Sequence, residues 1–358
     1  MKGEKITIKD VAAEAGVSST TVSMILNGTR AFPEETSRRV IDACNKLGYV
    51  RGGLHRNDNI EDKLIIAVVP TFSNYYFVNT VEAMQIRAKN LGYSVMVAET
   101  FRERVEEARV LKLCCSLPAA GVILFYPPEN SMYLRELEKE KAVIHVYDKG
   151  VYEDSSIIEF DGQRVGQLIG DHLLSLGHER IAFLTLGFEM KQVLRVRRLE
   201  GLRKAYTDKG YKPDESVLIC TQSSILPNVK RKLDGYDLGF AITKELIRRN
   251  ENITALACLN DMIAIGSMDA IIDSGKKVPN DYSVCGCDNI NIANYKGINL
   301  TTVDGFTTKT GQDAIDILIK ELEENNMSDH SGTVPRGVTR IEYYPRLIIR
   351  NSTGPRKA

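Results

Sequence analysis

Apolar residues recur at helical spacing near the start of the chain, and this pattern predicts two short helices joined by a turn. Their inward positions are Ile8, Val11, Ala12, Ala15, Val22, Ile25 and Leu26. Thr7, with Asp10 three residues on, is suited to cap the first helix, and Ser18 is suited to cap the second. Gly16 permits the tight turn between them. The segment therefore predicts a helix-turn-helix.

A third helix is predicted after this pair, because Pro33 suits a first helical position and Gly48 follows the last turn. Its apolar face is expected at Val40, Ile41, Cys44 and Leu47. The three helices form a predicted domain over residues 1–49. Residues 50–62 are polar and contain a Gly pair, so they are expected to form a hinge or linker.

The outward face of the second helix carries short hydroxyl and amide side chains together with Met24. A helix-turn-helix places the N-terminal end of its second helix in the major groove of DNA. Hydroxyl and amide groups suit phosphates and base edges, so double-stranded DNA is the expected partner; a helical hairpin without a ligand is the alternative. The candidate DNA contacts in this domain are Thr7, Ser18, Ser19, Thr20, Ser23, Met24, Asn27 and Thr36.

From residue 64 onward, short apolar runs alternate with amphipathic helices. The strands are expected at 64–69, 94–98, 121–125, 142–147, 156–160, 180–184, 216–220, 254–258, 282–286, 300–303 and 346–349. The helices expected between them include Val78–Leu91, Val165–Leu176, Arg198–Lys209, Gly239–Arg249 and Ala264–Ser274. This alternation predicts a doubly wound α/β architecture with parallel sheets, and so many strands predict two lobes within residues 63–358.

Ligands of such folds bind at the carboxyl ends of the strands. Tyr75-Tyr76-Phe77 follows the first strand and could stack on a ring, or pack in the core. Arg198 could donate a planar fork to vicinal hydroxyls or a carboxylate, or be a surface arginine among its neighbours Arg195, Arg197 and Arg203. Asp261 is expected to cap the next helix, which leaves Asn260 to point into the cleft. The acidic candidates at strand ends are Asp148, Asp161 and Asp288. Asp148 and Asp288 could each instead be a helix cap or a loop acid.

Composition bears on how the protein would bind DNA and on the cellular compartment in which it is expected. The 358 residues are 43% hydrophobic and 26% charged, with net charge zero, so DNA binding would rest on placed contacts more than on a broad basic field. Seven cysteines, mostly in apolar runs, predict reduced core thiols in a cytoplasm. No apolar run approaches the ~20 residues of a membrane span, and Met1-Lys-Gly-Glu-Lys is not a signal peptide.

Two other function classes are disfavoured. An enzyme would be expected to carry a recognisable catalytic or phosphate-binding motif, and the sequence contains no P-loop, G-x-G-x-x-G, G-x-S-x-G or H-E-x-x-H. We therefore expect no catalytic residues, no metal and no cofactor. A sugar-binding transport component would carry a signal peptide and lack the helix-turn-helix.

Ordered markers along nearly the whole chain, from Ile6 to Thr353, resemble the lactose-repressor (LacI/GalR) family of bacterial transcription regulators. In the N-terminal domain the markers are Thr7-Ile-Lys-Asp-Val-Ala, Ala15-Gly-Val-Ser, Thr21-Val-Ser and Leu26-Asn-Gly. Later markers are Leu176-Gly-His-Glu-Arg-Ile-Ala, Arg198-Leu-Glu-Gly-Leu, Asn260-Asp, Val278-Pro-Asn-Asp-Tyr-Ser-Val, Leu300-Thr-Thr-Val and Arg350-Asn-Ser-Thr. His178 in the Gly-His-Glu-Arg marker is expected to be structural.

This resemblance implies a homodimer, with a tetramer left open, that reads a pseudo-palindromic operator. It also implies a two-lobed body like that of periplasmic sugar-binding proteins, with a small-molecule effector between the lobes. The expected function is a transcriptional regulator, a repressor, that senses a sugar or sugar derivative; the alternative effector is a nucleoside or another non-sugar metabolite. Asp148 and Asp288 would accept hydrogen bonds from ligand hydroxyls.

The chain departs from the family pattern at several positions. Met24 stands where the family usually has a basic residue, and it offers a base only apolar contact. Arg51-Gly52 replaces the usual Pro-Asn of the hinge, and Asp58 aligns with the leucine that the family inserts into the minor groove. Either Leu54 is the wedge in another register, or this protein does not kink its operator in the usual way. In the body, Phe125 falls where the family has a hydroxyl-binding amide, which favours a less polar or differently shaped effector.

Overall fold

The computed structural model describes residues 7–27, 29–30, 32–47, 49, 63–148, 155–188, 193–328 and 337–357. The chain divides into two compact units, Met1–Ile60 and Glu61–Ala358, which we call the head and the body. Leu54, Asp58 and the rest of the predicted hinge lie outside the described residues. Within the described part, no helix is both long and apolar enough to cross a membrane.

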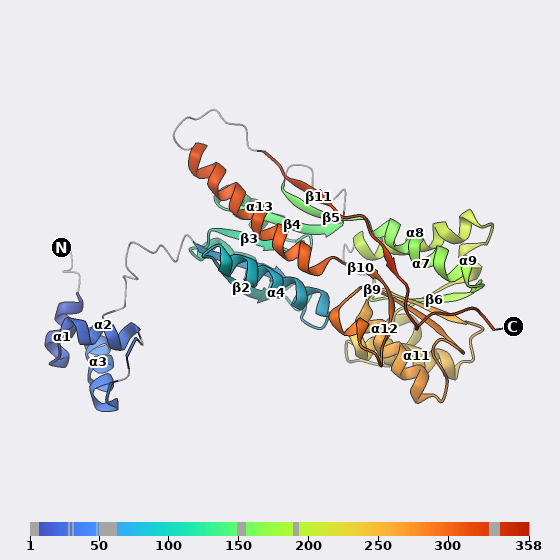
Figure 1. Cartoon of the computed structure of the whole chain (residues 1–358), viewed down its shortest axis with the longest axis horizontal. Helices are drawn as coiled ribbons and strands as arrows, with labels where there is room; N and C mark the ends of the chain where they lie inside the picture. Colours follow the sequence, from blue (N-terminus) through green and yellow to red (C-terminus); the bar gives the residue numbers. More distant parts are fainter. Residues whose placement is uncertain are drawn as a thin grey trace. The chain divides into compact units, whose positions relative to one another are not determined.

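The head contains three helices, α1 (Ile8–Ala15), α2 (Ser19–Asn27) and α3 (Glu34–Leu47), as the apolar spacing predicts (Figure 1). Their shared core consists of Val11, Ala12, Ala15, Val22, Val40 and Ala43. One predicted core position is wrong, because Ile41 is 50% exposed and Ala43 faces inward instead. Ala43 is 4% exposed and belongs to the core of the head.

Caps and a glycine fix the turn of the head. The backbone N–H and the hydroxyl of Thr7 both donate to the Asp10 carboxylate at 2.7 Å, and Ser18 Oγ accepts from Thr21 N at 3.0 Å. Gly16 has φ +63°, and an added Cβ would lie 2.9 Å from the Arg39 guanidinium. The predicted caps and turn glycine are therefore confirmed, and Arg39 adds a hydrogen bond to the turn carbonyl of Gly16 at 3.3 Å.

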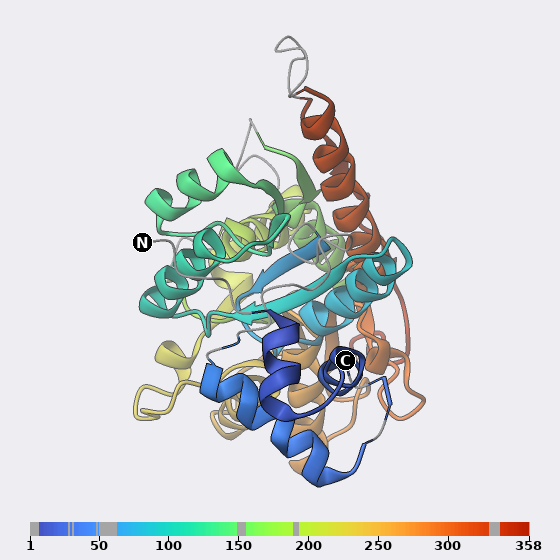
Figure 2. The same cartoon turned by 90° about the vertical axis from the view of Figure 1, so that its left-hand side faces the viewer.

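The first lobe of the body is a six-stranded parallel sheet in the order β11-β5-β4-β3-β1-β2. Its strands are β1 (Leu64–Val69), β2 (Ser94–Glu99), β3 (Gly121–Leu124), β4 (Ala142–Asp148), β5 (Ile157–Phe160) and β11 (Arg340–Glu342). Its helices are α4 (Tyr75–Asn90), α5 (Arg104–Ser116), α6 (Ser131–Glu140) and α13 (Thr307–Ser328). Helices α4 and α13 cover one face of the sheet, and α5 and α6 cover the other (Figure 2).

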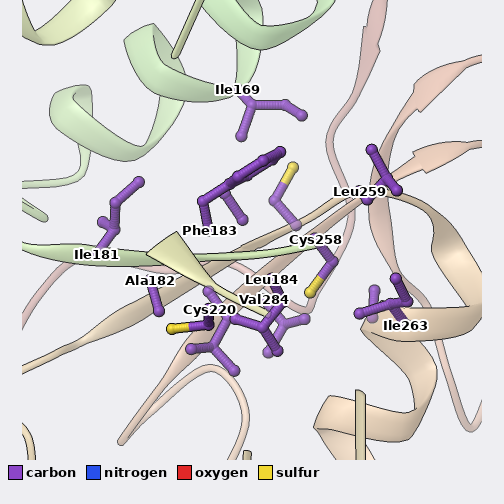
Figure 3. Close-up of a cluster of buried hydrophobic side chains, with 14 of the residues drawn as sticks. Ile169, Ile181, Ala182, Phe183, Leu184, Cys220, Cys258, Leu259, Ile263 and Val284 are labelled. Carbon is purple, nitrogen blue, oxygen red and sulfur yellow. The ribbon is translucent and has the colours of Figure 1, made fainter. Parts of the chain in front are cut away.

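The second lobe is a six-stranded sheet in the order β12-β10-β9-β8-β6-β7, parallel except for β12. Its strands are β6 (Ile181–Leu184), β7 (Val217–Cys220), β8 (Ala255–Cys258), β9 (Ser283–Asp288), β10 (Thr301–Asp304) and β12 (Leu347–Ile348). Its helices are α7 (Gly162–Ser175), α8 (Val193–Asp208), α9 (Pro213–Ser216), α10 (Gln222–Ile225), α11 (Gly235–Arg248) and α12 (Asp261–Asp273), with a 3₁₀ turn at Asn291–Asn294. Figure 3 shows Ile169 of α7 and Ile263 of α12 on opposite sides of this sheet.

The two predicted lobes are confirmed, and the differences lie at the ends of elements. Helix α4 begins at Tyr75 and not at Val78, because Asn74 caps it by accepting from Tyr76 N at 3.0 Å. The short strand β11 was not predicted, since its charged, partly exposed residues carry no apolar run. The run at 346–349 does form a strand, β12, but it is antiparallel to its neighbour.

Two smaller predictions concern polar residues of the core. Cys114, Cys220, Cys258, Cys285 and Cys287 are buried free thiols as predicted, whereas Cys44 and Cys115 are only half-buried. The structural role of His178 is confirmed: its ring nitrogens lie 2.8 Å from the Thr254 hydroxyl and 3.0 Å from both the Ser283 hydroxyl and the Gly354 carbonyl. These contacts join three segments of the second lobe.

Candidate functional site

The predicted DNA contacts of the head are at least partly accessible where the structure describes them. Thr7, Ser18 and Thr20 are exposed, and Ser19, Ser23, Met24 and Thr36 are half-buried. Met24, expected on the outward face of α2, is half-buried. Its carbonyl accepts from Thr29 N at 3.2 Å. The side chain of Asn27 lies outside the described part of the head, as does Leu54 of the hinge.

The body holds a cavity between its lobes, at the carboxyl ends of the strands of both sheets. Its volume is about 140 Å³. Residues after β1, β3, β5, β8 and β9 line it, which is where the alternating pattern places a ligand. We call this space the interlobe cavity.

One wall of the interlobe cavity is aromatic. The Tyr76 and Phe77 rings at the start of α4 meet edge to face, with centroids 5.3 Å apart. Phe77 meets Phe125 in the same way at 5.9 Å, and Tyr76 meets Phe160 at 6.2 Å. Such contacts hold rings in place. The predicted aromatic platform thus comes from two residues of the cluster, while Tyr75 is 43% exposed.

The floor of the cavity is formed where the chain crosses between lobes. The crossings follow β5, β10 and β11, and they bring Phe160, Phe306 and Tyr343 together. The Tyr343 ring lies 6.0 Å from that of Phe160 and stacks on that of Phe306 at 5.1 Å. Each ring belongs to a different crossing, so this cluster packs the three connections between the lobes against one another.

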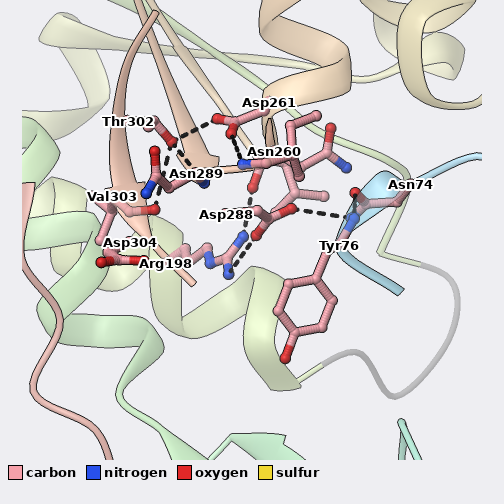
Figure 4. A network of polar contacts seen from close by, with 12 residues as sticks. Asn74, Tyr76, Arg198, Asn260, Asp261, Asp288, Asn289, Thr302, Val303 and Asp304 are labelled. Atoms are coloured by element: carbon pink, nitrogen blue, oxygen red, sulfur yellow. Dashed lines mark hydrogen bonds and ion pairs between the residues drawn. The ribbon is translucent and has the colours of Figure 1, made fainter. Parts of the chain in front are cut away.

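Asp288 is the central acidic group of the cavity (Figure 4). It ends β9 with φ +114°, a strained conformation for aspartate, and strained backbone clusters at functional sites. Its carboxylate accepts from Nδ2 of Asn74, in the first lobe, at 3.1 Å. It also lies 3.8 Å from Nη2 of Arg198, whose Nη1 donates to the Leu259 carbonyl. Burial raises the pKa of Asp288 to about 6, although the Arg198 charge lowers it.

A second buried carboxylate, Asp261, is the first residue of α12 and binds groups next to the end of β9. It accepts from the Thr302 hydroxyl at 2.6 Å and from Ile290 N at 3.0 Å. Burial, and then the Asp288 charge, raise its pKa. The expectation that Asp261 caps α12 is wrong: Asn260 is the cap and accepts from Ile263 N at 2.9 Å. The side chain of Asn260 still lines the cavity, but its oxygen is engaged by the helix.

The position of Arg198 depends on two glycines where α7 and α8 cross. A Cβ on Gly166 would lie 1.9 Å from the Arg198 carbonyl oxygen, and a Cβ on Gly201 would lie 1.8 Å from the Gln163 carbonyl oxygen. Only glycine therefore allows the two backbones to approach so closely. The marker Arg198-Leu-Glu-Gly201 thus contains both the candidate ligand-binding side chain and the residue that sets its distance from α7.

The structure gathers most of the predicted body residues around one cavity. Tyr76, Phe77, Asp161, Arg198, Asn260 and Asp288 all line it. Asp161 also caps α7 by accepting from Arg164 N at 3.0 Å. The side chain of Asp148 lies outside the described part of the chain.

Sequence reasoning missed several lining residues, which are Asn74, Arg102, Arg195, Asp304 and Tyr343. Arg195, expected at the surface beside Arg198, is only 7% exposed and donates to the Gly187 carbonyl at 2.6 Å. Asn74 carried a usable signal, because a cap residue directly before an aromatic cluster marks a helix that starts at a strand end. Arg102 and Tyr343 carried none, since their neighbours in sequence lie on exposed turns and edge strands.

A helix-turn-helix head joined to a two-lobed body with a ligand-sized cavity defines a ligand-responsive DNA-binding protein. The family described as "Periplasmic binding protein-like domain" matches residues 170–353, about half of the chain, and "Bacterial regulatory proteins, lacI family" matches residues 7–52. The chain belongs to the lacI family of bacterial regulatory proteins and is a DNA-binding transcriptional regulator with a small-molecule effector domain.

Relatives and solved structures resemble the chain over nearly its whole length. The "HTH-type transcriptional repressor PurR" of Mannheimia succiniciproducens is 29% identical over 350 residues, covering 97% of this chain and 98% of the relative. The lac repressor dimer bound to operator and the anti-inducer ONPF has TM-score 0.62 at 24% identity, covering 98% of this chain and all of that one. A LacI family regulator from Enterococcus faecium with bound ribose has TM-score 0.68 at 23% identity, covering 82% of this chain and all of that one.

Proposed function

We propose that this chain is a homodimeric repressor whose operator affinity is set by a ring-shaped, hydroxyl-bearing metabolite in the interlobe cavity. The observation that carries this is the cavity itself, which combines an aromatic wall with the Arg198–Asp288 pair. Related chains are named repressors, and a similar fold is seen as a dimer on operator DNA. Such a regulator acts on the bacterial chromosome, so we place it in the cytoplasm and assign it no catalytic activity.

In the head, we propose that α2 enters the major groove and that its N-terminal turn contacts base edges. Ser19, Thr20, Ser23 and Met24 would face the bases. Thr7, Ser18, Asn27 and Thr36 would contact phosphates, which position the domain without reading sequence. Two heads held about 34–36 Å apart, or a multiple of that spacing, would read the two halves of a pseudo-palindromic operator.

The size of the cavity bounds the effector. A dry cavity of about 150 Å³ admits benzene. The 140 Å³ between the lobes therefore accommodates one six-membered ring, as in a monosaccharide, and a nucleoside would have to extend beyond it. The ring would lie against Tyr76 and Phe77 while its hydroxyls reach Arg198 and Asp288. Structurally similar regulators bind ribose and cellobiose, which supports a sugar or sugar derivative; a nucleoside is the alternative that the same wall would accept.

The coupling between effector and operator would run through lobe closure. Among the described residues, the polar contacts that join the lobes include Asn74 to Asp288 at 3.1 Å and Arg102 to Asp234 at 3.8 Å. An effector that replaces the Asn74 contact would change the balance between open and closed lobes. Because linkage is reciprocal, effector and operator would then alter each other's affinity, typically by about 1–3 kcal/mol.

The experiment combines binding-site selection with an effector screen. Full-length protein selects an operator from random duplexes, and a fragment that starts at Lys63 serves as the control that should not shift it. Sugars and nucleosides are then screened by thermal shift on the full chain, since a ligand at 100 times its Kd adds about 2.7 kcal/mol of stability. The proposal fails if the fragment binds the operator as well as the full chain does, or if compounds that stabilise the body leave operator affinity unchanged.

A further inference from the structure

A second hollow of the body adjoins the interlobe cavity and has a different chemistry. Its volume is about 400 Å³, and Arg102, Leu186 and Arg195 line both spaces. Its other wall is the segment after β7, from Gln222 to Leu238. We call this hollow the basic groove, because the charged residues that line it are four cations and a single carboxylate: Arg102, Arg195, Lys230, Lys232 and Asp234.

Three cations of the groove, Arg102, Lys230 and Lys232, are incompletely neutralised by the described residues. Asp234 lies 3.8 Å from Nε of Arg102, and it also caps α11 by accepting from Gly235 N at 2.8 Å. Nε of Arg102 is buried and has no hydrogen-bond partner among the described residues, and burial lowers the pKa of this arginine. Lys230 and Lys232 are exposed, and within the described part of the chain neither has an ion-pair partner. The groove therefore holds excess positive charge.

The loop of residues 229–233, which carries Lys230 and Lys232, is held in shape by one side chain. Nε2 of Gln222 donates to the carbonyls of Val229 at 2.9 Å and Arg231 at 2.7 Å, and its Oε1 accepts from Leu233 N at 2.9 Å. Three bonds from a single amide thus fix the backbone on both sides of Lys230 and Lys232. Arg231, between them, pairs instead with Asp237 at 2.9 Å and does not line the groove. Two lysines are presented to the groove in a set loop, which reduces the entropy lost on binding an anion.

We propose that the basic groove binds a phosphate group carried by the effector, whose ring occupies the interlobe cavity. This inference rests on the proposed function, because it assumes that the ring binds between the lobes. The shared residues Arg102 and Arg195 lie where a substituent would leave the cavity, and Lys230 and Lys232 lie beyond them. A phosphate offers charge-assisted bonds to several of these cations at once, which a neutral sugar cannot do.

The first test uses inorganic phosphate with the full-length protein at constant ionic strength, followed by calorimetry and by phosphorus NMR line broadening. Saturable binding is expected in the wild type, and it is expected to be at least about tenfold weaker in the double variant K230A/K232A. The matched control is Arg231→Ala, which removes a charge from the same loop but not from the groove. Equal phosphate binding by the double variant, or an equal loss in Arg231→Ala, overturns the proposal.

The second test asks whether the phosphate belongs to the effector. Affinities are compared within the pairs glucose and glucose 6-phosphate, ribose and ribose 5-phosphate, and adenosine and adenosine 5′-monophosphate. The phosphorylated member of the pair that fits the cavity is expected to bind at least about tenfold more tightly, and K230A/K232A should remove this advantage without changing the affinity for the unphosphorylated member. Equal affinities within every pair overturn the inference.

The proposed function and the phosphate inference can be disproved independently of each other. If neutral ring compounds bind, respond to Asp288→Ala and change operator affinity, the proposed function stands although the phosphate inference has failed. If phosphorylated compounds bind in the groove but no compound that binds the body changes operator affinity, the proposed function fails whatever the phosphate result.

Discussion

Replacing Asp288 by asparagine is expected to stabilise the body and at the same time weaken effector binding. The pKa of this buried carboxyl lies near 6, against 3.8 for an ordinary aspartate. A difference of about 2 pKa units, at 1.36 kcal/mol each, means that the ionised carboxylate costs the folded body about 3 kcal/mol above pH 6. Asparagine has nearly the same shape, can still accept from Asn74, and never ionises.

The sign of the pH dependence follows from the raised pKa. Between about pH 4 and pH 6 the folded wild type binds more protons than the unfolded chain, so its stability falls as the pH rises through this window. The variant lacks this loss. We therefore expect Asp288→Asn to be more stable than wild type by about 3 kcal/mol at pH 7.5 and by about half of that at pH 5.

Urea unfolding of the full-length protein, followed by circular dichroism at pH 5 and pH 7.5, measures this difference. Calorimetry with the identified effector measures the opposite effect: a charged acceptor is lost, so affinity should fall by about tenfold or more. A variant that is less stable than wild type at pH 7.5 would refute the reasoning, because Asp288 would then be a stabilising partner of Arg198. A stability difference that is the same at both pH values would refute it too.

Three further substitutions test other parts of the account. Met24→Arg should change the operator sequence recovered by binding-site selection while leaving head stability within about 0.5 kcal/mol, because Met24 lies on a partly accessible surface; an unchanged motif would exclude Met24 from base recognition. Gly201→Ala should destabilise the body by at least about 1–3 kcal/mol in urea and weaken effector binding, since its Cβ would lie 1.8 Å from the Gln163 carbonyl oxygen; wild-type values for both would contradict the close α7–α8 crossing. Asp58→Leu, in the hinge outside the described residues, should raise operator affinity and bending in a gel assay by supplying an apolar wedge; strong bending already in the wild type would point to Leu54.

The regular parts of the fold follow from the sequence, because a buried strand or helix face must be apolar. The strands from 64 to 303 were predicted from their apolar runs. The caps Thr7 and Ser18 were predicted because a hydroxyl side chain can satisfy the free backbone groups at the start of a helix. The helix that follows Asn260 was assigned the wrong cap, because Asn260 and Asp261 both suit that position. Asn260 takes the cap position because Asp261 binds elsewhere: it accepts from the Thr302 hydroxyl of β10 and from the backbone of Ile290, which follows β9.

The residues of the candidate site could be predicted only where they lie directly at the ends of strands. Asp288 and Tyr76 could be predicted because the carboxyl ends of parallel strands meet at one edge. Arg102 and Lys232 could not be, since each lies on a loop whose partner comes from the other lobe or from a side-chain clamp such as Gln222. Neither a contact between segments 132 residues apart, as for Arg102 and Asp234, nor a local side-chain bond to backbone, as for Gln222, leaves a periodic trace in the sequence.

The central claim is that a ligand in the interlobe cavity controls operator binding, and fluorescence anisotropy of the selected operator tests it most directly. Full-length wild type and Asp288→Ala are titrated onto the labelled operator with and without the compound that stabilises the body most. We predict that the compound changes wild-type operator affinity by about 5- to 150-fold and leaves that of the variant at its value without the compound. Equal operator affinity with and without a compound that saturates the wild-type cavity would contradict the account.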